Sequence, residues 1–124
     1  MHNPPRILIV DDNETNRDIL EARLTANGYE VLHAGDGEEA LAAAKQHRPD
    51  LILLDVMMPK LDGFEVCRRL KADPALKAIP IIVVTSYALS GDEDKARASG
   101  CDAYVAKPYS PRQLLAKIRE YLPK

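Results

Sequence analysis

The chain has 124 residues, of which 46% are hydrophobic, so it is large enough to bury the core of one ordinary domain. Its 17 basic and 19 acidic residues give a net charge of −2, and no run of lysines or arginines indicates a nucleic-acid partner. The two cysteines lack the spacing of a zinc site or a disulfide framework, and no apolar segment approaches the length of a membrane span. We therefore expect a soluble, cytoplasmic protein that binds neither nucleic acid nor membrane directly.

Five short apolar runs rich in Ile, Val and Leu alternate with stretches of helical periodicity. Runs of this length and composition are typical of strands that are buried on both faces of a sheet. They are Ile7–Val10, Tyr29–Ala34, Leu51–Leu54, Ile79–Val84 and Ala103–Ala106. A strand followed by a helix, repeated five times, predicts a parallel sheet with helices on both faces. No repeat or linker interrupts this order, and the last helix is expected to reach Leu122. We therefore expect residues 1–124 to form a single domain.

The predicted helices have recognisable starts. Four segments place a capping oxygen three residues before a Glu or Gln, a pattern that indicates a helix N-terminus. These segments begin at Asp36, Asp62, Ser90 and Ser110. Pro111 then occupies the favoured first position of the last helix.

Polar side chains follow four of the five predicted strands. The first strand ends at Asp11 and Asp12, the third at Asp55, the fourth at Thr85 and the fifth at Lys107. In an open parallel sheet, ligands bind beyond the carboxyl ends of the strands, so we expect these groups to meet at one edge. Asp55 is the most informative because it directly follows four apolar residues, and a buried charge is costly unless it is paired or bound to a metal.

The chemistry of this set is restrictive. Three carboxylates within a few ångströms repel one another, so a divalent cation is the natural occupant, and oxygen ligands favour Mg²⁺, or Mn²⁺, over softer metals. Magnesium keeps several waters, which leaves room for a phosphoryl group. A carboxylate can act as a nucleophile and become an aspartyl phosphate, and Asp55 is the best-placed acceptor. Lys107 would neutralise charge on the transferring group, and Thr85 would hydrogen-bond to one of its oxygens.

Each of these residues also has a simpler interpretation when it is taken singly. Asp12 could cap a helix that begins near residue 13, and Asp11 could be a solvated strand end. Thr85 is an ordinary residue at a strand end, and Lys107 could be surface charge. Their joint occurrence at four separate strand ends favours one site over four coincidences.

The motifs that carry these residues resemble those of the receiver domain of two-component response regulators, and the resemblance extends from Arg6 to Leu122. The acidic pair lies in ILIVDDN, the phosphoacceptor Asp55 in LILLDVMMPKLDG, the switch hydroxyl Thr85 in VVTS, and Lys107 in AKP. The resemblance implies a cis bond to Pro108, a metal site formed by Asp11, Asp12, Asp55 and the backbone carbonyl of Met57, and Tyr104 as the switch aromatic.

The fold implied by the resemblance is CheY-like and flavodoxin-like, a (βα)5 three-layer sandwich with a parallel sheet of order 2-1-3-4-5. The implied activity is Mg²⁺-dependent acceptance of a phosphoryl group from a histidine kinase or histidine phosphotransfer protein. Phosphorylation would draw in Thr85 and turn Tyr104 inward, changing the surface of helix four, strand five and helix five for a downstream protein target. The chain would be a monomer or weak dimer without an output domain, and would assist only its own phosphorylation and dephosphorylation.

Two stretches narrow the resemblance. SGDEDKARASGCDAYVAKP looks like the corresponding part of the DivK-like single-domain regulators, and LLDVMMPKLDGFEVCRRLKADP is similar to receivers of diguanylate-cyclase regulators.

Two other functions compete with a phosphoaccepting switch. A phosphatase of the haloacid-dehalogenase kind would want a second acid two residues after its nucleophile, where this chain has Met57. An adaptor of the same fold that works without phosphorylation would be expected to have lost a site residue, and none is missing.

Overall fold

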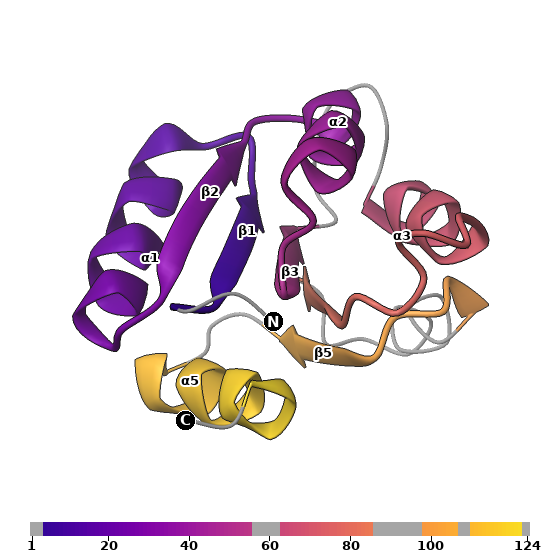
Figure 1. The fold of residues 1–124 in the computed structure, drawn as a ribbon. Helices are drawn as coiled ribbons and strands as arrows, with labels where there is room; N and C mark the ends of the chain where they lie inside the picture. Colours follow the sequence, from indigo (N-terminus) through magenta and orange to yellow (C-terminus); the bar gives the residue numbers. More distant parts are fainter. Residues whose placement is uncertain (1–3, 56–62, 86–97, 107–109, 123–124) are drawn as a thin grey trace.

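Five parallel strands form one sheet in the order β2-β1-β3-β4-β5 (Figure 1). The computed structural model describes residues 4–55, 63–85, 98–106 and 110–122. The strands are β1 (Arg6–Val10), β2 (Glu30–Ala34), β3 (Leu51–Asp55), β4 (Ile81–Thr85) and β5 (Ala103–Ala106). Each coincides with a predicted apolar run, and the expected strand order is confirmed.

Helices cover both faces of the sheet, which confirms the three-layer arrangement. The described helices are α1 (Glu14–Ala26), α2 (Gly37–His47), α3 (Gly63–Ala72) and α5 (Pro111–Tyr121). Helices α2 and α3 lie on one face, and α1 and α5 lie on the other (Figure 1). The helix expected to begin at Ser90 falls largely on residues 86–97, outside the described part of the chain. None of the helices described is long and apolar enough to cross a membrane.

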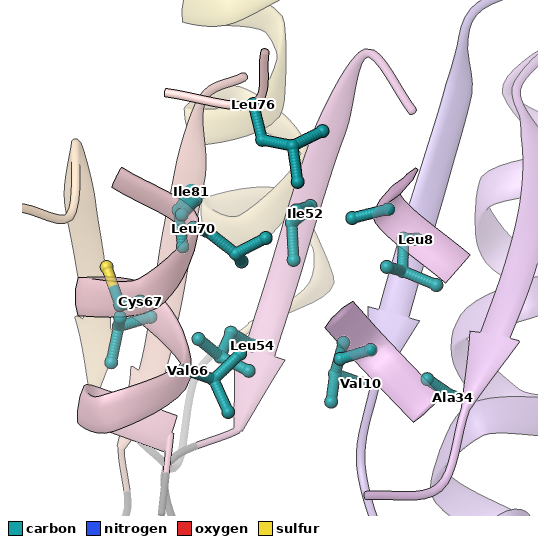
Figure 2. Packing of buried hydrophobic residues seen from close by; sticks show 13 residues of the cluster. Leu8, Val10, Ala34, Ile52, Leu54, Val66, Cys67, Leu70, Leu76 and Ile81 are labelled. Atoms are coloured by element: carbon teal, nitrogen blue, oxygen red, sulfur yellow. The ribbon is translucent and has the colours of Figure 1, made fainter. Parts of the chain in front are cut away.

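Alternate residues of the central strands pack into two separate cores, because successive side chains of a strand point to opposite faces. Leu8 and Val10 of β1 lie with Ile52 and Leu54 of β3 in the core under α2 and α3, part of which Figure 2 shows. The core under α1 and α5 takes the intervening residues, Ile7, Ile9, Leu51 and Leu53. This burial on both faces explains why the sequence of these strands is continuously apolar. It also places the strand ends between two covered layers.

Two helix starts show the predicted capping hydrogen bonds. Ser110 Oγ accepts from the Gln113 N–H at 3.1 Å, and Gln113 Oε1 accepts from the Ser110 N–H at 2.9 Å, so α5 begins with a complete capping box. At α2, Asp36 Oδ1 accepts from the Glu39 N–H at 2.8 Å. These bonds satisfy N–H groups that have no partner inside the helix.

A lysine ties α3 to the beginnings of β4 and β5, at the end of the sheet opposite the acidic residues. Lys71 Nζ donates to the carbonyls of Lys77 at 3.1 Å and Ile79 at 3.0 Å, and to Asp102 Oδ2 at 2.7 Å. The same Asp102 oxygen accepts from the Ile81 N–H at 2.8 Å. All three donors of the ammonium group are therefore used to hold this end of the sheet together.

Candidate functional site

Asp11 and Asp55 lie side by side at the carboxyl edge of the sheet. Strands β1 and β3 are paired with Val10 opposite Leu54, and the next residue in the chain is Asp11 after Val10 and Asp55 after Leu54. Paired strands are about 4.8 Å apart, so the two backbones are close at this point. Asp11 is 5% exposed and Asp55 is 7% exposed. Two carboxylates are thus held in a nearly dry layer at neighbouring strand ends.

Asp11 is fixed through its backbone and its side chain. Its N–H donates to the Ala34 carbonyl at 3.1 Å, and its carbonyl accepts from Arg17 Nη1 at 2.5 Å. Its carboxylate oxygen Oδ1 accepts from the Asn13 N–H at 2.9 Å. The N–H, the carbonyl and one carboxylate oxygen of Asp11 are thus each held by a hydrogen bond.

Asp12 differs from its neighbour because it is exposed. The cap of α1 is Asn13, whose Oδ1 accepts from the Asn16 N–H at 2.9 Å, so the alternative in which Asp12 caps the helix is wrong. Within the described residues, no three His, Cys, Asp or Glu side chains form a group that could hold a metal ion. The structure thus brings two of the three predicted carboxylates into the buried edge and leaves Asp12 at the surface beside them.

The two buried carboxylates fit a magnesium ion. Mg²⁺ commonly binds through one or two carboxylates and completes its octahedron with water and phosphate oxygens, so a third carboxylate is not required. A cation would also offset the repulsion between two like charges in this dry layer. The backbone carbonyl of Met57, the fourth expected ligand, lies outside the described residues.

The remaining predicted residues belong to the two strands beyond β3. Strand β4 pairs with β3 so that Val84 is opposite Asp55, and β4 ends at the next residue, Thr85. Thr85 is in turn paired with Ala106 of β5, the residue before Lys107 in the sequence. The backbone thus brings the ends of β1, β3, β4 and β5 to one edge, as predicted. Lys107 itself is outside the described residues.

Of the expected switch aromatic Tyr104 and the expected cis-proline Pro108, the described residues include only Tyr104. Tyr104 lies on β5, paired with Val83 of β4, and its half-buried ring packs against the core under α2 and α3. Pro108 and its predicted cis bond fall outside the described part of the chain. The position of Tyr104 is two residues before Ala106, the residue paired with Thr85.

A cavity of about 570 Å³ lies between α1 and α5 and reaches both buried aspartates. Its walls are mainly apolar and include Leu20 of α1, Val84 of β4 and Leu114 of α5. Sequence reasoning did not identify this cavity, because its shape depends on how two helices distant in the chain sit over the same face. Asp11 and Asp55 therefore form part of the wall of this cavity.

Sequence reasoning also missed Arg17, which contacts the acidic loop directly. The only indication in the sequence is its place in the first turn of the helix that follows the acidic pair, where an arginine is an ordinary surface residue.

Known proteins resemble this chain in both sequence and fold. A family model described as the response regulator receiver domain matches residues 7–119. The polar-differentiation response regulator DivK of Brucella anthropi is 44% identical over 119 residues, which cover 96% of this chain and 97% of DivK. The family and the DivK-like character expected from the sequence are thus confirmed.

Solved structures of similar proteins agree with this result. The chemotaxis protein CheY4 of Vibrio cholerae matches with a TM-score of 0.88 at 33% identity, covering 94% of this chain and 98% of that one. A receiver domain of a sensor histidine kinase from Pseudomonas aeruginosa has a TM-score of 0.88 at 34% identity, covering 97% of this chain and 98% of that one. That receiver holds a magnesium ion coordinated in its active-site cleft.

Proposed function

Because the chain belongs to the response regulator receiver domain family, we propose that it accepts a phosphoryl group on Asp55 from a histidine kinase or a histidine phosphotransfer protein. The observation that carries this proposal is the buried pair formed by Asp55 and Asp11 at the carboxyl edge of the sheet. A lone carboxylate at this depth would be costly, whereas two of them make a site for a divalent cation and a phosphoryl group.

In the proposed reaction, a carboxylate oxygen of Asp55 attacks the phosphorus atom of a phosphohistidine. The bond from phosphorus to the imidazole nitrogen breaks, and the ring, which carries a proton on its other nitrogen, leaves as a neutral histidine, so that an aspartyl phosphate remains. Magnesium, when bound, neutralises charge on the phosphoryl oxygens. Asp11 and Asp12, with the carbonyl of Met57, would hold the metal beside Asp55.

Two further residues complete the proposed site. Lys107 would compensate the charge of the phosphoryl oxygens, and Thr85 would hydrogen-bond to one of them after transfer. The strand pairing supports both roles, because Thr85 and the residue before Lys107 are opposite each other beside Asp55.

The proposed output is a change in the surface formed by the expected helix four, which falls largely outside the described residues, together with β5 and α5. Tyr104 is suited to this role because it is half-buried on β5, and its partner Val83 lies two residues before Thr85 on β4. A shift of the Thr85 backbone toward the phosphate would therefore be transmitted along β4 to the strand position beside the ring. A downstream protein would bind one of the two packings better, which is how a switch of this kind signals.

We also propose that the chain works in the cytoplasm, as a monomer or weak dimer, and that it catalyses no step on an external substrate. A phosphorylation-independent adaptor of the same fold is the alternative that the experiment below must distinguish.

Intact-mass measurement after incubation with a small phosphodonor tests the proposal. Acetyl phosphate and phosphoramidate should each add one phosphoryl group to the wild type, and the addition should require Mg²⁺. Asp55→Asn should abolish it, whereas Asp18→Asn, which changes an exposed aspartate of α1, should not. No addition to the wild type from either donor would favour the adaptor, and addition to Asp55→Asn would mean that another residue is the acceptor.

A further inference from the structure

Arg17 reaches out of α1 to the backbone between the two acidic residues. It is half-buried, and its Nη1 donates to the Asp11 carbonyl at 2.5 Å. That carbonyl belongs to the peptide that joins Asp11 to Asp12. It lies one residue beyond the last pair between β1 and β2, in which Val10 is opposite Ala34. The guanidinium thus donates to the backbone of the acidic pair just beyond the end of the β1–β2 ladder.

The guanidinium lies close to Gly35, where a larger residue would crowd it. A Cβ on Gly35 would lie 3.3 Å from Arg17 Nη1 and 3.3 Å from Glu39 Oε2, closer than most such contacts. The Gly35 N–H donates to the same Glu39 oxygen at 2.6 Å. Arg17 Nη1 therefore lies beside the Gly35 position while it donates to the Asp11 carbonyl.

We propose that Arg17 is a positioning residue for the metal site, which holds the Asp11–Asp12 peptide in a single orientation. Asp12 is exposed, and the described structure provides no packing that would fix its carboxylate. Its direction therefore depends on the backbone that precedes it. By fixing the carbonyl of this peptide, Arg17 limits the positions that the Asp12 carboxylate can take relative to Asp11. This inference rests on the proposed function, because it concerns the metal of the same site.

Three interpretations of Arg17 predict different effects on magnesium affinity when its charge and its hydrogen bonds are removed. If Arg17 acts only through its positive charge, Arg17→Met should tighten Mg²⁺ binding, because a nearby like charge has been removed. If it merely satisfies a buried carbonyl, the variant should lose stability and bind Mg²⁺ as before. If it positions the acidic pair, Mg²⁺ should bind more weakly, by about 10-fold or more, as is usual for residues that orient metal ligands.

The experiment is a Mg²⁺ titration of the metal-free protein without phosphodonor, followed by the NMR signals of the backbone amides. We expect Arg17→Met to weaken Mg²⁺ binding by about 10-fold and Arg17→Lys, which keeps a charged donor, to recover most of the loss. Arg119→Met is the matched control, because Arg119 Nη2 also donates to a single oxygen, Asn27 Oδ1 at 3.1 Å, but between the ends of α5 and α1. It should bind Mg²⁺ like the wild type. Thermal unfolding in EDTA reports the structural effect of each substitution separately.

Gly35→Ala provides a second variant in case Arg17→Met does not fold. It keeps the arginine but crowds its guanidinium, and it should also weaken Mg²⁺ binding. Unchanged or tighter binding in Arg17→Met and Gly35→Ala, with a wild type that binds Mg²⁺, would overturn the positioning role and leave the proposed function standing. A wild type that neither binds Mg²⁺ nor accepts a phosphoryl group would overturn both.

Discussion

Replacing Asp55 with asparagine should stabilise the metal-free protein, although it removes the proposed phosphoacceptor. Asp55 is 7% exposed and Asp11 is 5% exposed. They directly follow Leu54 of β3 and Val10 of β1, which are opposite each other in the sheet. Without a divalent cation, two carboxylates in this position repel each other, and an amide of the same shape does not take part in that repulsion.

The size of the effect depends on the distance between the two carboxylates, and the spacing of about 4.8 Å between paired strands sets its scale. Two charges about 6 Å apart at an effective dielectric constant of about 20 repel by about 3 kcal/mol. Weaker hydrogen bonds to the amide would offset roughly 1–2 kcal/mol of this gain, since bonds to a charged group are stronger than bonds to a neutral one. A net stabilisation of about 1–2 kcal/mol remains. For a chain of this length it corresponds to a rise in Tm of about 4–8 °C.

Magnesium should reduce or reverse the difference. A cation at about 100 times its dissociation constant stabilises the folded state by about 2.7 kcal/mol. The wild type should receive this stabilisation, whereas Asp55→Asn should receive less because one of the two buried charges that attract the metal is gone. The stabilising effect of the substitution is therefore expected in EDTA and not in saturating Mg²⁺.

The assay is urea and thermal unfolding followed by circular dichroism, in EDTA and in Mg²⁺, with Asp18→Asn as the control. That substitution removes an equal charge from an exposed position of α1 and should change the free energy of unfolding by less than about 0.5 kcal/mol. An Asp55→Asn variant that is less stable than the wild type in EDTA would refute the reasoning. It would mean that favourable contacts of the Asp55 carboxylate exceed its repulsion by Asp11.

Two further predictions concern the end of the sheet away from the site. Lys71→Met should lower the free energy of unfolding by about 2–4 kcal/mol in urea titrations, because it removes three hydrogen bonds from a side chain that is 18% exposed and leaves Asp102 without its cation. The control is Lys45→Met at an exposed position of α2, and an equal loss of stability in the two variants would contradict this prediction. Burial, aided by the neighbouring Cys67 thiol, raises the pKa of Cys101 from 9.0 to about 11, so its alkylation by iodoacetamide should keep accelerating as pH rises above 9, where an ordinary thiol has levelled off. Because folding raises the pKa of this thiol, its contribution to the free energy of unfolding is fully present below pH 9 and is lost as pH rises toward 11. An alkylation rate that levels off near pH 9 would show that the thiol pKa is not raised.

The sequence by itself determined the sheet and its edge. The apolar runs are continuous because both faces of the strands are covered, so they could be recognised without knowing what covers them. The capping box of Ser110 and Gln113 could also be read directly, because all of its atoms lie within four consecutive residues. The placement of Asp11 beside Asp55 followed once the order of parallel strands was known, since that order brings both strand ends to one edge.

The choice of the first helix cap required the structure. Asp12 and Asn13 are both good capping residues, so the local sequence did not distinguish them. The structure assigns the cap to Asn13, whose own N–H is held by the Asp11 carboxylate. Asp12 is thereby left exposed beside the buried pair, and available for the metal role that we propose.

Contacts between distant segments were decided only by the tertiary structure. Lys71 and Asp102 are 31 residues apart, and their pairing depends on where α3 ends relative to β5. The contact of Arg17 with the Asp11 carbonyl depends on the rotation of α1 about its axis and on the space beside Gly35. Sequence periodicity specifies which face of a helix is buried, but it does not specify which polar group a long side chain at the edge of that face will reach. That depends on the packing of neighbouring elements, which here places a guanidinium against the loop of the candidate site.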